Sequence, residues 1–166
     1  MTKTSVPKTV TTTDMHGNHH QARVDQLVWR PSAYGVIIHA GKILLIKYGD
    51  SHHLPGGGVD LGELAESAVI REVFEETGIT VANPKILTST MNFYTWEDLD
   101  TGIPEHYQSI LMYYRCDYVS GKFSKAGHES HEQALKLEPV WLPLGELDHI
   151  KIGSSVDWLA LIKPLL

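Results

Sequence analysis

Glutamates and an arginine crowd the stretch from Gly57 to Ile79, which reads GGVDLGELAESAVIREVFEETGI and contains Glu63, Arg71, Glu72, Glu75 and Glu76. On a helix, Glu72, Glu75 and Glu76 are three and four positions apart and therefore share one face. Clustered carboxylates repel one another unless a cation lies among them. Mg²⁺ prefers oxygen ligands, and metal ions neutralise the charge that develops during phosphoryl transfer. The spacing therefore indicates a metal site suited to phosphate chemistry.

A charged, solvated helix face is the alternative interpretation of these residues. Arg71 would then balance the neighbouring acids, as on many surface helices, where each pair contributes a few tenths of a kcal/mol. We favour the metal because the acids outnumber the arginine and no lysine follows them at i+4. The preceding glycines, Gly56 to Gly58, allow unusual backbone angles and close approach to a ligand. A backbone carbonyl of this loop could therefore join the carboxylates around the metal.

A helix is expected over residues 64–77, because Gly78 behind it is a typical left-handed stop. Ala65, Ala68 and Val69 share the sector of the glutamates, so the first turns can pack closely on a sheet. Ile70 and Phe74 lie on the opposite side of this helix. We therefore expect the helix to be covered on two faces.

Strands are expected on both sides of this helix in the chain. Apolar and β-branched runs predict strands at 34–39, 42–47, 86–95, 108–119 and 137–142, a short strand at 52–54, and a hairpin of 9–13 with 19–24. Asn83-Pro84 and the acidic segment 96–105 are expected to interrupt the strands. Ser154 with Asp157 resembles a capping box that opens a terminal helix through Ile162. This pattern indicates one mixed α/β (α+β) layer structure.

Length and composition indicate a single domain over residues 1–166, long enough to bury a core. The formal charge of −6 argues against a nucleic-acid partner, because phosphate backbones bind basic surfaces. The only cysteine, Cys116, cannot form an intrachain disulfide. The chain has neither a run of about 18 apolar residues nor an apolar N-terminal core. A cytoplasmic protein with no membrane segment is therefore expected.

Gly57, Glu63, Arg71-Glu72, Glu75-Glu76 and Gly78 also match the fixed positions of a known motif. The stretch Gly57–Ile79 resembles the complete Nudix box, and its aliphatic positions are filled as well. The resemblance implies the Nudix fold, an α/β/α sandwich with a mixed β-sheet between helices. Residues 1–30 would then be an N-terminal extension or β-hairpin. It also implies hydrolysis, dependent on Mg²⁺ or Mn²⁺, of a nucleoside diphosphate linked to another moiety.

The resemblance further implies a role for each residue of the metal site. By motif position, Glu72, Glu75 and Glu76 would be metal ligands, and the carbonyl of Gly56 a further one. Arg71 would orient glutamate side chains through a charge-assisted fork of hydrogen bonds. These residues and Glu63 form the catalytic set that we expect.

The general base is left open by the resemblance, since it differs between branches of the family. Glu72 is our first hypothesis, and Glu129 or Glu132 in the polar loop 126–133 is the second. Glu63 is similar to the family position whose side chain orients the metal ligands without binding the metal itself. In either case we expect a metal-polarised water to attack one phosphorus.

The expected partner is a small nucleoside diphosphate derivative: a nucleoside triphosphate, a dinucleoside polyphosphate, ADP-ribose or a nucleotide sugar. Loops around Tyr94 and Glu129 should select among these substrates. The sequence is compatible with either a homodimer or a monomer. A non-catalytic module of the same fold that senses a nucleotide is the alternative function. An isomerase of isoprenoid diphosphates would need a catalytic cysteine, whereas Cys116, inside the strand-like run YYRCDY, is expected in the core.

Overall fold

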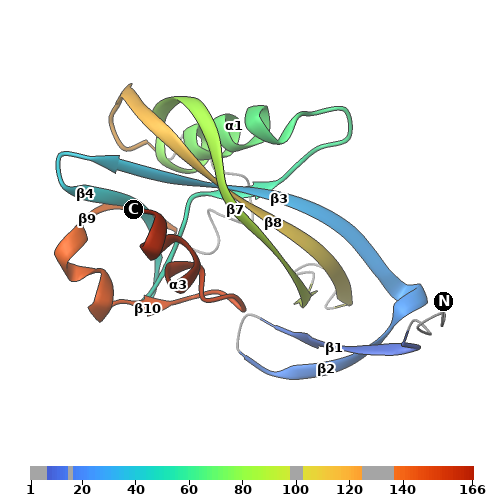
Figure 1. The fold of residues 1–166 in the computed structure, drawn as a ribbon. Coiled ribbons are helices and arrows are strands. Elements are labelled where there is room, and N and C mark those ends of the chain that lie inside the picture. The colour runs from blue at the N-terminus through green and yellow to red at the C-terminus, as the bar shows by residue number, and fades with distance from the viewer. Residues whose placement is uncertain (1–6, 15–16, 98–102, 125–136) are drawn as a thin grey trace.

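The structure is a computed structural model that describes residues 7–14, 17–97, 103–124 and 137–166. The described strands form one ten-stranded mixed sheet, with α1 (Ala65–Thr77) over one face and α3 (Trp158–Ile162) over the other (Figure 1). The strands are β1 (Thr9–Thr13), β2 (His19–Arg23), β3 (Leu27–His39), β4 (Lys42–Tyr48), β5 (Ser51–His53), β6 (Gly56–Gly58), β7 (Ile79–Glu97), β8 (Pro104–Gly121), β9 (Glu138–Pro143) and β10 (Lys151–Ile152). Short 3₁₀ helices span Val24–Gln26, Leu144–His149 and Lys163–Leu165. The mixed sheet between helices confirms the expected fold class.

The sheet is centred on β3 and β8, which run parallel and pair from Leu27–His106 to Ile37–Cys116. The order along the sheet is β10-β5-β4-β3-β8-β7-β1-β2, with β6 paired to β3 and β9 paired to β4. Strand β6 pairs antiparallel with β3, where Gly56 lies opposite Tyr34 and Gly58 opposite Ser32. The glycine stretch is therefore a short strand fixed to the middle of the sheet.

Side-chain alternation along β3 divides the interior into two cores. Ala33 and Ile37 face α1 and pack with Val73. Val36 points the other way and packs with Trp158 of α3. Because both faces of β3 are covered, its run YGVII can be apolar throughout.

Helix α1 confirms the predicted boundaries to within one residue. Gly78 adopts the left-handed conformation, with φ of 73°, and its N–H donates to the carbonyl of Phe74. Ala68 and Val69 are fully buried against the sheet. The expected second covered face is wrong in part, because Phe74 is 54% exposed while Ile70 only borders the core. The opposite side of α1 is therefore open at Phe74.

Strand β7 is longer than the sequence predicts, because Asn83-Pro84 does not end it. The β7–β8 pairing steps from Ala82–Asp117 to Lys85–Arg115, so Asn83 and Pro84 fall within a register shift. Asn83 has a positive φ of 52° there, and the missing N–H of Pro84 costs no ladder hydrogen bond. Asn83 and Pro84 therefore form a β-bulge within β7 and not the strand break that their residue types predict.

The predicted loop 96–105 is also partly wrong. Trp96 pairs with Glu105 and Glu97 with Pro104, so the β7–β8 ladder continues into the segment from both ends. Residues 98–102 lie outside the described part of the chain. Long-range strand pairing overrides the local turn chemistry of this acidic stretch.

The capping residue of the terminal helix differs from the prediction. Helix α3 begins at Trp158, and Asp157 is its N-cap, with Oδ1 accepting from the N–H of Ala160 at 3.0 Å. Ser154 instead accepts from Val156 N–H in a local turn. Serine and aspartate are equally good N-cap residues, so the sequence pattern is compatible with a helix that starts after either Ser154 or Asp157.

The predicted N-terminal hairpin is present. Strands β1 and β2 pair antiparallel from Thr9–Arg23 to Thr13–His19. The hairpin then docks on the sheet, where Thr13 pairs with Tyr94 of β7 and the buried hydroxyls of Thr12 and Thr95 lie 2.5 Å apart. The hairpin therefore extends the β7 edge of the sheet.

Candidate active site

Arg71 is the hub that gathers the predicted acids. Its Nε and Nη2 donate to the two oxygens of Glu63 at 3.1 and 2.8 Å. Its Nη1 donates to Glu72 at 2.9 Å and to Glu75 at 3.0 Å, so these two carboxylates meet at one nitrogen. Nη2 also donates to the carbonyl of Gly58 at 3.1 Å. One guanidinium thus ties the helix face to the glycine strand.

Glu76 and Glu72 contact the glycine strand directly. The N–H of Gly56 donates to Glu76 Oε2 at 2.8 Å, and Glu76 is 8% exposed. A Cβ added at Gly57 would lie 2.7 Å from Glu72 Oε2, which is closer than real Cβ contacts. At position 57 only a glycine leaves room for the Glu72 carboxylate next to the backbone. Steric exclusion of a side chain therefore explains why Gly57 is a glycine.

The charge distribution follows from these contacts. The hydrogen bond from Arg71 lowers the pKa of Glu63 below its ordinary value. The hydrogen bonds that Arg71 donates to Glu63, and then to Glu72 and Glu75, raise the pKa of Arg71 despite its partial burial. Glu63 therefore stays ionised and holds the arginine in place, as the second layer of a metal site does.

The oxygen-rich cluster offers carboxylate ligands for a divalent cation. Among the described residues, no three carboxylate, imidazole or thiolate groups converge as a ready-made metal site. Two of the glutamates, Glu72 and Glu75, bind Arg71, and Glu76 binds a backbone N–H. The donor chemistry nevertheless fits, because Glu72 and Glu76 lie against the glycine strand, Glu75 shares Arg71 with Glu72, and hard cations prefer oxygen ligands.

A pocket of about 190 Å³ opens beside β6 on the face of the sheet away from α1. Tyr34, Tyr94 and Trp96 line it with aromatic surface, and Thr13 and Asp14 of the hairpin form part of its wall. Tyr34 pairs with Gly56, whose N–H binds Glu76, so the β3–β6 pair separates this pocket from the glutamate cluster on the other face. Flat rings of this kind can stack on a base.

Asn92 adds polarity to the same pocket. Its Nδ2 donates to Ser155 Oγ at 2.8 Å, whereas its buried Oδ1 has no hydrogen-bond partner among the described residues. A buried acceptor without a partner is costly unless a ligand satisfies it. The pocket therefore combines ring surfaces with an available acceptor.

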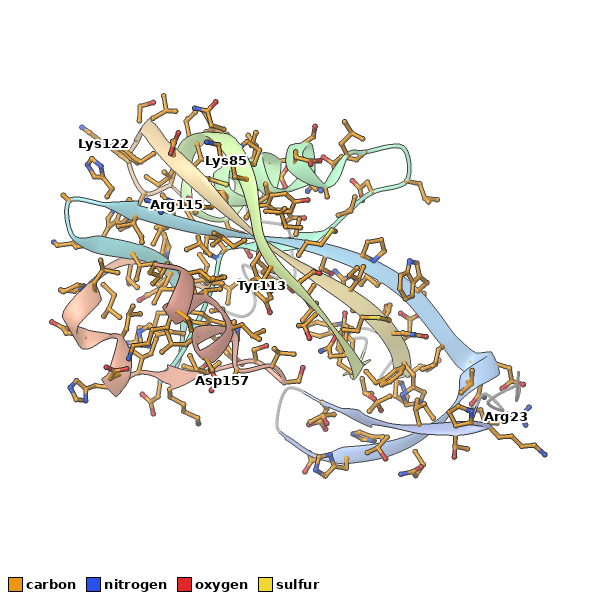
Figure 2. All side chains as sticks on the ribbon, in the orientation of Figure 1. Arg23, Lys85, Tyr113, Arg115, Lys122 and Asp157 are labelled. Atoms are coloured by element: carbon orange, nitrogen blue, oxygen red, sulfur yellow. The ribbon has the colours of Figure 1, made fainter. Side chains whose placement is uncertain are left out.

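The other aromatic candidates divide between core and site. Tyr113 and Tyr114 are 2% and 4% exposed and belong to the core, and Tyr113 lies near the middle of the sheet in Figure 2. Tyr94 and Tyr107 are opposite one another on β7 and β8 and stack with ring centroids 5.0 Å apart. The two alternative bases, Glu129 and Glu132, lie outside the described residues.

Cys116 is a core residue, as expected. It is 3% exposed, and burial raises the pKa of its thiol to about 12. A thiol in this state is neither an acid nor a nucleophile at neutral pH. The structure therefore does not support the isoprenoid isomerase alternative.

We expect native Cys116 to resist alkylation. At pH 8, iodoacetamide should modify it at least about 100-fold more slowly than it modifies the unfolded chain, because the thiolate is scarce and inaccessible. The rate is measured by intact-mass spectrometry with and without denaturant. Equal rates in the two states would show that this cysteine is accessible and ionisable.

Comparison with known families decides what this arrangement is. The NUDIX domain family matches residues 29–160, which is most of the chain. The chain belongs to the Nudix hydrolase family. The glutamate cluster of α1 is its Nudix box, seen here in three dimensions.

Relatives of this Nudix chain differ in what their names say they act on. The ADP-ribose pyrophosphatase of Methanocaldococcus jannaschii is 37% identical over 123 residues, which cover 71% of this chain and 67% of that protein. The RNA pyrophosphohydrolase of Edwardsiella ictaluri is 38% identical over 78 residues, and these cover 45% of this chain and only 44% of that protein. The chain thus spans less than half of the RNA pyrophosphohydrolase that it matches.

Solved structures agree at the level of the fold. A MutT structure described for Aliivibrio salmonicida and Vibrio cholerae has a TM-score of 0.56 and 20% identity, covering 82% of this chain and 99% of its own. No helix among the described residues is long and apolar enough to cross a membrane.

Two contacts near the Nudix box could not be predicted from the sequence. The predicted hairpin β1–β2 precedes residue 29, where the family match begins, yet its Thr13 and Asp14 line the pocket. Arg30 lies beside Gly58 and carries no motif that marks it. Each becomes visible only through contacts between segments far apart in the sequence.

Proposed function

We propose that this protein is a pyrophosphohydrolase that uses Mg²⁺ or Mn²⁺ to cleave a diphosphate linkage in a nucleoside diphosphate derivative. The observation that carries the proposal is the junction of α1 and β6, where Arg71 gathers three glutamates and Gly57 leaves room for Glu72. A charged surface helix would not require a glycine strand fitted against its acids. This contact favours a metal site over the solvated helix face.

In this proposal Glu72, Glu75, Glu76 and the carbonyl of Gly56 hold the metal. When bound, such an ion polarises a water and neutralises charge on the phosphate oxygens. Arg71 keeps Glu72 and Glu75 oriented through its hydrogen bonds to both carboxylates.

Glu63 fixes Arg71 from the other side through two hydrogen bonds. Glu72 is the proposed general base, because its carboxylate lies directly against Gly57. Glu129 and Glu132 remain the alternative. A base within hydrogen-bonding reach of the attacking water is what either choice requires.

The pocket beside β6 is the proposed place for the nucleoside. The aromatic surfaces of Tyr34, Tyr94 and Trp96 and the free acceptor of Asn92 are the features that a base can use. The names of the relatives, ADP-ribose pyrophosphatase and RNA pyrophosphohydrolase, support a phosphoanhydride as the bond broken.

A hydrolysis screen with the products separated by ion-exchange chromatography tests the proposal. The panel contains nucleoside triphosphates, ADP-ribose, dinucleoside polyphosphates, nucleotide sugars and a 5′-triphosphorylated oligoribonucleotide, each with Mg²⁺, with Mn²⁺ and with EDTA. At least one compound should be cleaved, and only in the presence of metal. If calorimetry shows nucleotide binding but no compound is cleaved, the non-catalytic sensing module replaces the enzyme.

A further inference from the structure

Arg30 is a half-buried cation close to the active site. Its Nη1 donates to the hydroxyl of Tyr94 at 2.5 Å, and its guanidinium carbon lies 5.6 Å from the centre of the Tyr107 ring. Its Nε and Nη2 lie 3.3 Å from where a Cβ on Gly58 would be. The side chain is therefore held in a defined place next to the glycine strand.

The charge of Arg30 has no paired carboxylate within the part of the chain that the structure describes. Burial raises the pKa of Tyr94 above its usual range, and it raises the pKa values of Tyr107 and Tyr34 to about 12. All three hydroxyls are therefore protonated at neutral pH. A partly buried charge without a counter-charge is unfavourable, so binding of an anionic ligand next to Arg30 would be favourable.

Strand β6 separates this cation from the acids. Gly57 faces the carboxylate of Glu72, whereas Gly58 faces the guanidinium of Arg30. The carbonyl of Gly58 is itself bound by Arg71. Among the described strands β6 pairs only with β3, so its other edge is not covered by a neighbouring strand. A ligand that crosses this edge would meet the acid cluster on one side and Arg30 on the other.

We propose that Arg30 binds a phosphate oxygen of the substrate at the glycine strand, on the side opposite the metal-binding glutamates, and that Tyr94 positions it. The inference rests on the proposed function for its ligand class, a nucleoside diphosphate derivative. The planar guanidinium presents donors in a fork that matches phosphate oxygens. Within the described residues Tyr94 accepts from one of these donors, and the proposed ligand takes the others.

The tyrosine pair supplies the rigidity that this binding needs. The Tyr94 and Tyr107 rings are nearly parallel, at 15°, and they leave the hydroxyl of Tyr94 aimed at Arg30. Tyr94 also lines the aromatic pocket. It therefore links the phosphate contact to the proposed nucleoside site, and a substrate can engage Arg30 while its base lies in the pocket.

Binding is measured by calorimetry in EDTA, so that the readout depends on neither metal nor turnover. The probes are inorganic pyrophosphate and α,β-methylene-ADP, which resists hydrolysis. The variants are Arg30→Gln, Arg30→Lys and Tyr94→Phe. Arg23→Gln is the matched control, because Arg23 pairs with Asp25 at the far end of the hairpin, away from α1 (Figure 2).

Arg30→Gln should weaken both probes by about 10- to 100-fold, as expected for the loss of a charge-assisted phosphate contact. Arg30→Lys should restore part of the affinity, because it keeps the charge but loses the fork. Tyr94→Phe keeps the stacked ring and should weaken both probes several-fold, and Arg23→Gln should leave both unchanged. In turnover assays KM should rise more than kcat falls.

Unchanged pyrophosphate binding in Arg30→Gln would overturn the proposal. If that variant does not fold, unchanged binding in both Arg30→Lys and Tyr94→Phe overturns it equally. Weakening for α,β-methylene-ADP alone would mean that Arg30 contacts the nucleoside and not phosphate, which also refutes the proposal. Failure of the substrate screen with intact Arg30-dependent pyrophosphate binding would instead refute the hydrolase and leave the anion site standing.

Discussion

Replacing Glu76 by glutamine is expected to lower kcat by at least about 1,000-fold while the protein stays folded. Glutamine keeps an oxygen that can accept the hydrogen bond from Gly56 N–H, so α1 should remain attached to β6. What is lost is the negative charge at a position only 8% exposed, where metal affinity depends on it most. A 1,000-fold loss corresponds to roughly 4 kcal/mol of transition-state stabilisation.

The metal-linked stability of Glu76→Gln separates a lost ligand from a damaged fold. In the wild type, Mg²⁺ at about 100 times its Kd should raise Tm by about 5–10 °C. The variant should show about the same Tm as the wild type in EDTA, because glutamine can still accept the hydrogen bond from Gly56 N–H, but little increase with Mg²⁺. Glu66→Gln is the control, since Glu66 is an exposed acid of the same helix. Full turnover in both Glu76→Gln and Glu75→Gln would remove the metal assignment.

Gly57→Ala is expected to reduce kcat by about 100-fold through a single methyl group. The added Cβ would lie 2.7–2.8 Å from the carboxylate atoms of Glu72, so the carboxylate must move. A displacement of about 1 Å at a catalytic group can cost on the order of 100-fold in rate. The backbone at Gly57 does not have a left-handed φ, so the effect should arise from Glu72 and not from strain.

The response of Gly57→Ala to metal distinguishes the two roles of Glu72. If Glu72 chiefly binds the cation, raising Mg²⁺ should recover much of the lost activity. If it is the general base, kcat should stay low at saturating Mg²⁺. Gly145→Ala is the matched control, because a Cβ there would meet nothing within 4 Å. Wild-type kinetics in Gly57→Ala would show that the Glu72 carboxylate has no fixed place against the glycine strand.

These two predictions and the Arg30 proposal concern one structural unit, the strand β6. Its residues contact Glu76 through the N–H of Gly56, Glu72 at Gly57, and Arg71 and Arg30 at Gly58. Acids thus lie along one side of a three-residue strand, and at its end lies Arg30, which has no ion-pair partner among the described residues. A diphosphate is negatively charged and binds metal ions. It therefore matches both Arg30 and the acids that would hold a metal in the proposed function.

Much of the active site could be predicted from the sequence because its geometry is local. The spacing of Glu72, Glu75 and Glu76 places them on one face of any helix, and Gly78 ends that helix in any context. The hairpin of residues 9–23 was likewise predicted from adjacent β-branched runs and a glycine turn. Each of these features depends on residues close in the chain.

Errors arose where distant pairing competes with local signals. Asn83-Pro84 signals a break, but β8 pairs on both sides of it and converts the break into a bulge. Phe74 suggested a second covered face, yet side-chain periodicity does not say what the tertiary fold places there. Ser154 and Asp157 both had capping chemistry, and the docking of Trp158 in the core fits the later start.

The sequence by itself determined the family, the helix and the acids that make the proposed chemistry. Only the tertiary structure decided that Arg30 lies beside Gly58, that Tyr94 holds it, and that the hairpin reaches the pocket. The reason is physical. Helix periodicity and turn conformations are fixed within a few bonds, whereas the contact of Arg30 with Tyr94 requires β3, β8 and β7 to pair side by side in one register.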